Sequence, residues 1–322
     1  RVDDAREHLR MFCTLNVAAT KLQGKSTNIS QTIFGQWLDE YALNEEEVGR
    51  VRVVLGLSPR EQIGPLLSLV RENPDNTAAA IGLIYALRLS GLLESVGGLA
   101  KGAMIPERII QFWDSLEVTP DIQRLMNSWG DKNPGYEYVL FNDETARRFL
   151  QENFTADVFR AYVRVKEPAQ KSDIFRLAYL AKEGGVYVDA DDFCLAPLAG
   201  LIAPQALLAL YQEDHGTVGN NFIAVVPQHP IILEALAQVV LAVNRGDGDM
   251  PWLSTGPALL TRSIAQHIAN SKLSYSAVVE RLVVLNRREF SQKVAIHCLA
   301  AYKETNRHWS NSTFAVRKGG VK

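Results

Sequence analysis

One stretch of the chain, residues 171–193, constrains the fold more than any other. It reads KSDIFRLAYLAKEGGVYVDADDF: apolar residues at helical spacing, a Gly-Gly pair, a short β-branched and aromatic run, and then acidic residues. Ser172 or Asp173 is expected to cap the helix. Gly184 and Gly185 supply the left-handed stop that glycine accepts most easily. The stretch therefore predicts a helix that returns directly into a short buried strand.

Acidic residues follow that strand. Asp189 and Asp191 come directly after 186–188, and the carboxyl end of a strand is the edge where open α/β sheets bind ligands. Their carboxylates are expected to point the same way from an extended backbone and to reach one hard divalent cation, Mn²⁺ or Mg²⁺. The tripeptide alone is a weak motif, because Asp247 and Asp249 form a second pair between glycines, where a solvated turn is expected. Its place after a helix and a strand favours the first pair.

A wider pattern surrounds the first acidic pair, in the order Asp173, Arg176, Gly184, Gly185, Tyr187, Asp189 and Asp191. This order resembles the DXD-containing sugar-transferase family, which includes Golgi mannosyltransferases, capsule-type bacterial enzymes and the glucosylating domains of large clostridial toxins. Further segments match that family in the right order, at 105–113, 127–138, 220–224, 255–257 and 308–312. The resemblance covers about residues 105 to 313.

The resemblance implies roles for individual side chains. The implied catalytic residues are Asp173, Arg176, Asp189 and Asp191. The implied nucleotide-sugar contacts are Phe112, Trp113, Ser172, Tyr187, Asn221 and Trp309. The implied metal ligands are Asp189, Asp191, His308 and Asn311. Within this set, Phe112 and Trp113 would hold the base, and Asp173 with Arg176 the sugar hydroxyls. Trp129, by contrast, is expected in the core.

The distribution of patterns divides the chain near residue 100. Residues 1–100 show helical patterning alone, with helices expected to open at Ser58-Pro59 and at Asn76-Thr77. These helices are expected to pack as a cap on the catalytic core, with a partner-binding module as the alternative. Residues 101–322 alternate between strands and helices, which predicts an α/β fold with a mostly parallel sheet. The expected strands are 105–113, 136–141 and 186–188, and the expected helices 120–129, 143–153 and 171–182.

The resemblance narrows this class to a GT-A type, single Rossmann-like nucleotide-diphospho-sugar transferase fold with an N-terminal helical region. The implied function is metal-dependent, retaining transfer of a hexose from a nucleotide sugar, preferably UDP-linked, to an unidentified glycan, lipid or protein. Two alternatives stay open. An apolar strand that ends in Asp-x-Asp also fits a haloacid-dehalogenase type phosphatase with Asp189 as nucleophile. A sugar-nucleotide or partner-binding module without catalysis is the other.

Bulk composition excludes several other classes. The chain holds 34 basic and 36 acidic residues, so a nucleic-acid partner is not expected. Its three cysteines, Cys13, Cys194 and Cys298, are too few and too far apart for a disulfide framework or a zinc cluster, which favours a reducing compartment. Its apolar runs are shorter than the ~18 residues of a membrane span. A cytoplasmic location is expected, or that of a secreted or translocated effector if a segment before Arg1 carries a signal.

Overall fold

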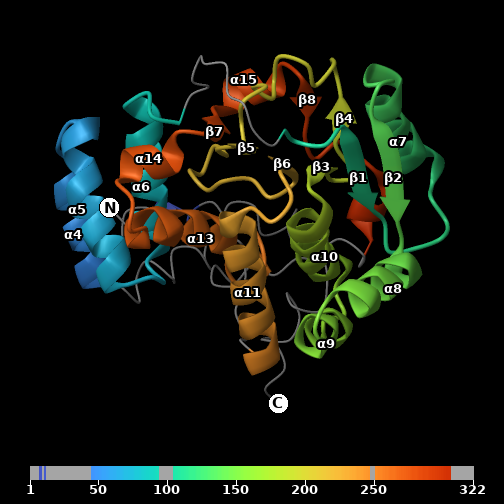
Figure 1. Ribbon diagram of the computed structural model, residues 1–322, viewed down its shortest axis with the longest axis horizontal. Coiled ribbons are helices and arrows are strands. Elements are labelled where there is room, and N and C mark those ends of the chain that lie inside the picture. Colours follow the sequence, from blue (N-terminus) through green and yellow to red (C-terminus); the bar gives the residue numbers. More distant parts are fainter. Residues whose placement is uncertain (1–6, 9–10, 12–44, 94–103, 247–250, 306–322) are drawn as a thin grey trace.

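A mixed six-stranded sheet organises the computed structural model of the chain (Figure 1). The structure describes residues 7–8, 11, 45–93, 104–246 and 251–305. Expectations for Cys13, for the Asp247 and Asp249 pair, and for His308, Trp309 and Asn311 therefore lie outside the described residues. The strands follow the order β2 (Glu137–Phe141), β1 (Arg108–Phe112), β3 (Gly185–Val188), β6 (Phe222–Val225), β5 (Leu208–Tyr211) and β7 (Leu282–Leu285).

Strand direction follows the expected pattern with one reversal. β1 runs parallel to β2 and β3, and β5 runs parallel to β7, whereas β6 is antiparallel to both of its neighbours, β3 and β5. The carboxyl ends of β1, β3, β5 and β7 consequently meet at one edge of the sheet. The predicted α/β class with a mostly parallel sheet is confirmed. A separate two-stranded sheet pairs β4 (Phe193–Cys194) with β8 (Val294–Ala295).

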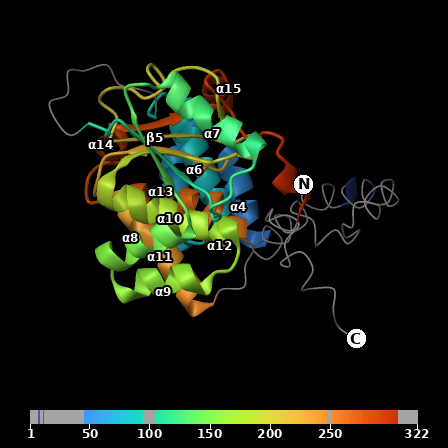
Figure 2. The same ribbon diagram turned by 90° about the vertical axis from the view of Figure 1, so that its right-hand side faces the viewer.

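Helices cover both sides of the sheet. Figure 1 and Figure 2 show α8 to α11 and α13 grouped on one side, with α7 and α15 on the other. The helices of the sheet region are α7 (Pro120–Lys132), α8 (Asp143–Asn153), α9 (Ala156–Arg164), α10 (Pro168–Glu183), α11 (Pro230–Arg245), α12 (Pro251–Ser254), α13 (Pro257–Asn270), α14 (Tyr275–Val279) and α15 (Arg287–Ser291). A 3₁₀ turn, η2 (Ala301–Glu304), follows β8. Within the described residues, no helix is long and apolar enough to span a membrane.

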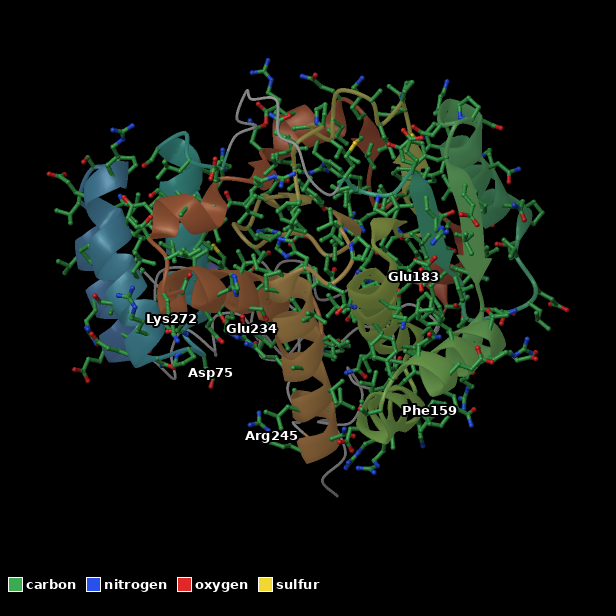
Figure 3. All side chains as sticks on the ribbon, in the orientation of Figure 1. Asp75, Phe159, Glu183, Glu234, Arg245 and Lys272 are labelled. Carbon is green, nitrogen blue, oxygen red and sulfur yellow. The ribbon has the colours of Figure 1, made fainter. Side chains whose placement is uncertain are left out.

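The helix before the acidic pair begins earlier than the sequence predicted. α10 starts at Pro168, with Glu167 as its N-cap residue, because proline at the first helical position supplies the fixed φ that a helix needs there. The expectation that Ser172 or Asp173 caps this helix is therefore wrong. Both residues lie inside the helix and are buried. Figure 3 places Glu183 at the other end of α10, and its carboxylate lies 3.7 Å from the guanidinium of Arg108 in β1.

The Gly-Gly pair joins α10 to β3 as predicted. Gly184 ends the helix with φ 66°, and Gly185 begins the strand with φ 107°. A Cβ on Gly184 would lie 2.7 Å from the backbone N of Pro227, and one on Gly185 would lie 2.9 Å from the carbonyl oxygen of Arg108. Both positive φ and close approach to neighbouring backbone require glycine here. The pair thus sets where β3 begins and where its acidic end emerges.

The N-terminal helices pack on the sheet region. They are α4 (Glu45–Leu55), α5 (Pro59–Glu72) and α6 (Thr77–Leu89), and the side chain of Asn76 caps α6 as predicted. The Arg71 guanidinium donates to the carbonyl of Ala269 at 2.6 Å, and that of Arg262 donates to the Thr77 hydroxyl at 2.8 Å. Buried side chains of these helices belong to the same apolar cluster as those of β1, β3 and α10. Residues 45–93 are thus helical and pack against the sheet region, while the division of the chain into two domains near residue 100 stays a prediction.

Candidate donor site at the end of β3

A pocket opens where β1 and β3 end and α10 begins. It encloses about 720 Å³, part of which is open solvent. The part of this space that the centre of a water-sized molecule can occupy is about 140 Å³. The walls of the pocket come from three places: the end of β1, the first turns of α10, and the acidic turn after β3 with the segment that runs from His297 into η2. The lining residues are Phe112, Trp113, Asp114, Pro168, Ala169, Ser172, Arg176, Asp189, Ala190, Asp191, His297 and Tyr302.

The acidic residues lie in a turn. The backbone N of Asp189 still donates to the carbonyl of Asn221 at 2.9 Å, which extends the pairing of β3 by one bond. The backbone N of Asp192 then donates to the carbonyl of Asp189 at 3.2 Å and closes a turn. The expected extended geometry, with two parallel carboxylates, is therefore wrong. Asp189 and Asp191 nevertheless both line the pocket.

A buried arginine, Arg176, donates a hydrogen bond to Asp189. One of its carboxylate oxygens, Oδ1, accepts from Arg176 Nη2 at 3.0 Å and from the hydroxyl of Tyr187 at 3.0 Å. The Arg176 guanidinium also donates to Ser172 Oγ and lies 4.6 Å from the centre of the Tyr187 ring. Burial and the nearby Asp191 raise the pKa of Asp189, and Arg176 opposes this effect. Tyr187 thus combines packing with hydrogen bonding.

Asp173 lies one layer beneath the pocket. Its Oδ1 accepts from Asn220 Nδ2 at 2.8 Å and its Oδ2 from the hydroxyl of Thr255 at 2.7 Å. Arg176 Nη2 approaches the same Oδ1 at 3.3 Å. Burial raises the pKa of Asp173 to about 6, although Arg176 works in the opposite direction. Both carboxylate oxygens therefore have partners from loops that the sequence marked at 220–224 and 255–257.

Asp191 faces a different cation. Its Oδ2 forms an ion pair with Lys303 Nζ at 2.5 Å and accepts from the hydroxyl of Tyr302 at 2.9 Å. Burial favours the protonated carboxyl, but the ammonium of Lys303 outweighs it and lowers the pKa of Asp191. Asp191 is therefore the most readily ionised acid of the turn.

Asp192 is fully buried, and it anchors the turn. Its Oδ1 accepts from the backbone N of His297 at 2.8 Å, and its Oδ2 accepts from Asn221 Nδ2 at 2.6 Å. The amide oxygen of Asn221 accepts in turn from the hydroxyl of Tyr211, at the end of β5. Burial and the charges of Asp191 and Asp189 raise the pKa of Asp192 well above its ordinary value. A chain of hydrogen bonds thus links the acidic turn to the neighbouring half of the sheet.

Aromatic side chains form the opposite wall. Trp113 follows β1, and its ring meets that of Tyr302 edge to face with centres 5.2 Å apart. Its indole N–H donates to the carbonyl of Glu117. Phe112 packs against Phe175 of α10, with ring centres 5.5 Å apart. Both rings line the pocket, although Phe112 is only 5% and Trp113 only 7% exposed, and aromatic rings of this kind can stack on a flat heterocycle.

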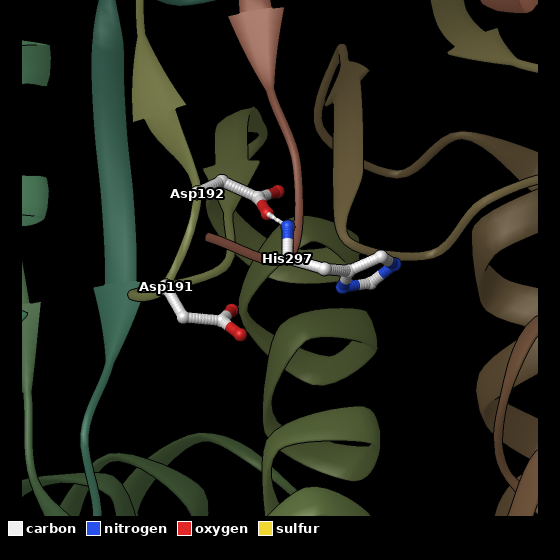
Figure 4. Close-up of side chains that lie close together, drawn as sticks. All are labelled: Asp191, Asp192 and His297. Carbon is white, nitrogen blue, oxygen red and sulfur yellow. Dashed lines mark hydrogen bonds between the residues drawn. The ribbon is translucent and has the colours of Figure 1, made fainter. Parts of the chain in front are cut away.

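The side chains at the turn suit a hard cation. Asp191, Asp192 and His297 each offer one ligand atom, and these atoms lie within 4.8 Å of one another (Figure 4). Both oxygens of Asp192 accept hydrogen bonds from within the protein, whereas Asp189 accepts at Oδ1 and Asp191 at Oδ2. Asp189 and Asp191 line the pocket together with His297, so carboxylate, imidazole and water ligands can meet there. Such a donor set fits Mn²⁺ or Mg²⁺.

The structure brings most of the predicted site together. Phe112, Trp113, Ser172, Arg176, Asp189 and Asp191 line the pocket. Asp173, Tyr187 and Asn221 support it from behind, and Trp129 is buried in the core as expected. Sequence reasoning missed Asp192, His297, Tyr302 and Lys303. Asp192 adjoins the motif and was visible as a third acid, whereas Tyr302 lies 111 positions from Asp191 and carries no motif of its own.

Comparison with known proteins confirms the resemblance. Residues 119–209 match the family described as the glycosyltransferase sugar-binding region containing the DXD motif. The mannosyl phosphorylinositol ceramide synthase SUR1 of Saccharomyces cerevisiae is 33% identical over 42% of this chain and 35% of its own length. Inositol phosphoceramide mannosyltransferase 2 of Schizosaccharomyces pombe is 32% identical over 51% of this chain and 48% of its own. The chain thus spans less than half the length of these two relatives.

Toxin sequences and structures also show similarity. Toxin Afp18 of Yersinia ruckeri is 31% identical over 40% of this chain and 6% of its own length. Among solved structures, the PaToxG glycosyltransferase covers 65% of this chain and 86% of its own, with 21% identity and a TM-score of 0.42.

Proposed function

Since residues 119–209 carry the sugar-binding region of a DXD glycosyltransferase, we propose that this protein transfers a hexose from a nucleotide sugar with the help of a divalent cation. The observation that carries the proposal is the convergence of one aromatic wall, one buried arginine and the two DXD carboxylates on a single pocket. A nucleotide sugar needs all three: a surface for its base, donors for its hydroxyls and oxygen ligands for the metal at its diphosphate.

In this proposal each wall of the pocket has its own task. Trp113 stacks on the base, with Phe112 behind it. Arg176, held by Ser172 and by Asp189, presents its guanidinium to the sugar side. Asp189 and Asp191, with His297 beside them, hold the cation, which when bound neutralises the leaving diphosphate. His308, Trp309 and Asn311 keep their implied roles as proposals outside the described residues.

We also propose that the transferred sugar keeps its anomeric configuration. The carboxylates that line the pocket are Asp114, Asp189 and Asp191. The two DXD acids have cationic partners and a proposed metal, so neither is placed as a free nucleophile. An attack by the acceptor on the same face as the departing diphosphate then needs no covalent enzyme intermediate. The haloacid-dehalogenase alternative asks Asp189 to attack a phosphate, and the hydrogen bonds from Arg176 and Tyr187 to its Oδ1 make it a poor nucleophile.

The acceptor and the sugar are proposed from the relatives. Both fungal relatives are named for adding mannose to an inositol-containing ceramide. We therefore include mannose among the hexoses and a lipid-linked polyol among the acceptors, beside the UDP-sugars and the protein or glycan acceptors expected from the family.

The test is nucleotide release from a panel of UDP- and GDP-sugars with Mn²⁺, with and without lipid, glycan and protein acceptors. We expect release of one nucleotide above background, its acceleration by one acceptor class, and its loss with chelator. Binding of a nucleotide sugar without any release would favour the non-catalytic module. A beryllium-fluoride adduct on Asp189 would favour the phosphatase.

A further inference from the structure

The acidic pair carries two resident cations, one on each carboxylate. Arg176 Nη2 lies 3.0 Å from Asp189 Oδ1, and Lys303 Nζ lies 2.5 Å from Asp191 Oδ2. The two ion pairs neutralise the two carboxylates that a metal would need. Any divalent cation that binds here must therefore compete with a side chain already in place.

The two cations differ in how firmly they are held. The Arg176 side chain is almost completely buried and donates to the carbonyl of Asn220 and to both the carbonyl and the hydroxyl of Ser172. Its planar fork is fixed by those acceptors. The Lys303 side chain is 17% exposed and reaches Asp191 through a flexible four-carbon stem. Lys303 is accordingly the cation that can be exchanged.

The turn that carries Lys303 is part of the pocket wall. The backbone N of Ala301 donates to Asp121 Oδ2 at 2.7 Å, and that of Lys303 donates to the carbonyl of Ala300 at 3.0 Å. Tyr302 packs edge-on against Trp113 and shares Asp191 Oδ2 with Lys303. The ammonium is thus placed on Asp191 by an ordered turn and not by an unrestrained surface side chain.

We propose that Lys303 is a built-in counter-cation of Asp191 that competes with the divalent metal for this carboxylate and so sets the metal affinity of the site. The inference deepens the proposed function and rests on it for the identity of the metal. It assigns Lys303 and Tyr302 to the donor site as positioning residues. Coordination of a metal by Asp191 would require the ion pair between Lys303 and this carboxylate to break.

Metal affinity tests this directly. Mn²⁺ is titrated into the whole protein and followed by electron paramagnetic resonance in the wild type, Lys303→Met, Lys303→Gln, Lys303→Arg and Lys272→Met. We expect both uncharged variants at 303 to bind Mn²⁺ at least about tenfold more tightly, since a competing charge at contact distance is gone. Lys303→Arg should stay near the wild type. Lys272, an exposed lysine labelled in Figure 3, is the matched control and should change nothing.

A measurement on the unaltered chain makes the result independent of folding in the variants. Acylation of lysine amines, read by mass spectrometry, should speed up at Lys303 when Mn²⁺ is added and stay constant at Lys272. Unchanged or weaker Mn²⁺ binding by both uncharged variants, or constant labelling of Lys303, would overturn the inference. Nucleotide release with Mn²⁺ in spite of such a result would leave the proposed function standing. Tighter Mn²⁺ binding by the variants without release of any nucleotide would support the role of Lys303 and contradict the proposed function.

Discussion

Three acids within four positions have three different environments. Asp189 pairs with a buried arginine, Asp191 with a partly exposed lysine, and Asp192 with backbone and amide donors alone. The directions of their pKa shifts differ accordingly: raised for Asp189 and Asp192, lowered for Asp191. Asp191 is thus the acid best suited to remain an anionic ligand.

Replacement of Asp191 by Asn should therefore remove catalysis with little loss of folded protein. We expect turnover to fall by at least about 100-fold, or about 3 kcal/mol of transition-state stabilisation. The control is Asp157→Asn, because the Asp157 and Arg160 side chains are both more than half exposed and such pairs contribute about 0–1 kcal/mol. Turnover per folded molecule, with folding followed by circular dichroism, decides the matter. An equal loss in both variants would argue against the assignment.

Sequence reasoning at this scale found the residues that lie close in the chain. Asp173 and Arg176 lie in α10, Asp189 and Asp191 lie in the turn after β3, and the resemblance to the family linked all four. Lys303 lies in η2, after β8, and its position beside Asp191 depends on tertiary contacts that a local sequence pattern does not predict. The turn at Asp189 was not predicted either. It forms because the backbone N of Asp192 donates to the carbonyl of Asp189, and this hydrogen bond replaces the extended conformation expected for residues 189–191.

The junction of α10 and β3 depends on the conformations of its two glycines. In Gly185→Ala, a Cβ at positive φ would meet the Arg108 carbonyl at 2.9 Å, so we expect the free energy of unfolding to fall by at least about 1–3 kcal/mol. Gly130→Ala is the control, because Gly130 lies inside α7 and a Cβ there meets nothing within 4 Å. That variant should gain about 0.5–1 kcal/mol. Urea unfolding of both proteins measures the difference, and destabilisation by both would show that the junction is not special.

The loop after β5 holds a carboxyl that titrates near neutrality. Glu213 Oε2 accepts from the Thr217 hydroxyl at 2.6 Å, and burial raises the pKa of Glu213 to about 7. A raised pKa means that the folded state holds the proton more tightly than the unfolded state. This carboxyl therefore lowers stability as pH rises from about 4.5 to about 7.

Replacement of Glu213 by Gln should flatten that dependence. We expect the variant to gain stability relative to the wild type at pH 8, by the order of 1–3 kcal/mol, and to differ little at pH 4.5. Melting temperatures at the two pH values provide the measurement. The same difference at both pH values would show that ionisation of Glu213 is not its cause.

Elements with strong local signals were predicted well. α8 has the bounds read from its sequence, and α6 has the predicted cap, because each has its capping residues beside the helix. The antiparallel direction of β6 was not predicted, because the four apolar residues of Phe222–Val225 do not indicate in which direction a strand runs. Direction is fixed by the neighbours β3 and β5, which are far away in the sequence.

At the scale of the whole molecule, the N-terminal helices and the sheet region share one apolar cluster. Leu83 of α6 is fully buried in it, so Leu83→Ala should cost about 2–5 kcal/mol and lower the single melting transition of the entire protein. Tyr85→Ala, at a half-exposed position on the same helix, should cost far less. Calorimetry would reveal two separate transitions if the helices folded independently of the sheet region. That outcome would contradict a common core.

The antiparallel strand of the six-stranded sheet, β6, has a consequence for how such a protein can diversify. The family match ends at Ala209, within β5, just before the chain turns back through β6. α10, β3 and the acidic turn precede the reversal in the sequence, whereas His297, Tyr302 and Lys303, which reach the same pocket, follow it. For the proposed transfer, we expect relatives that differ in acceptor to vary in the loops after β5, and to vary less at 297–303, where the chain returns to the acidic turn.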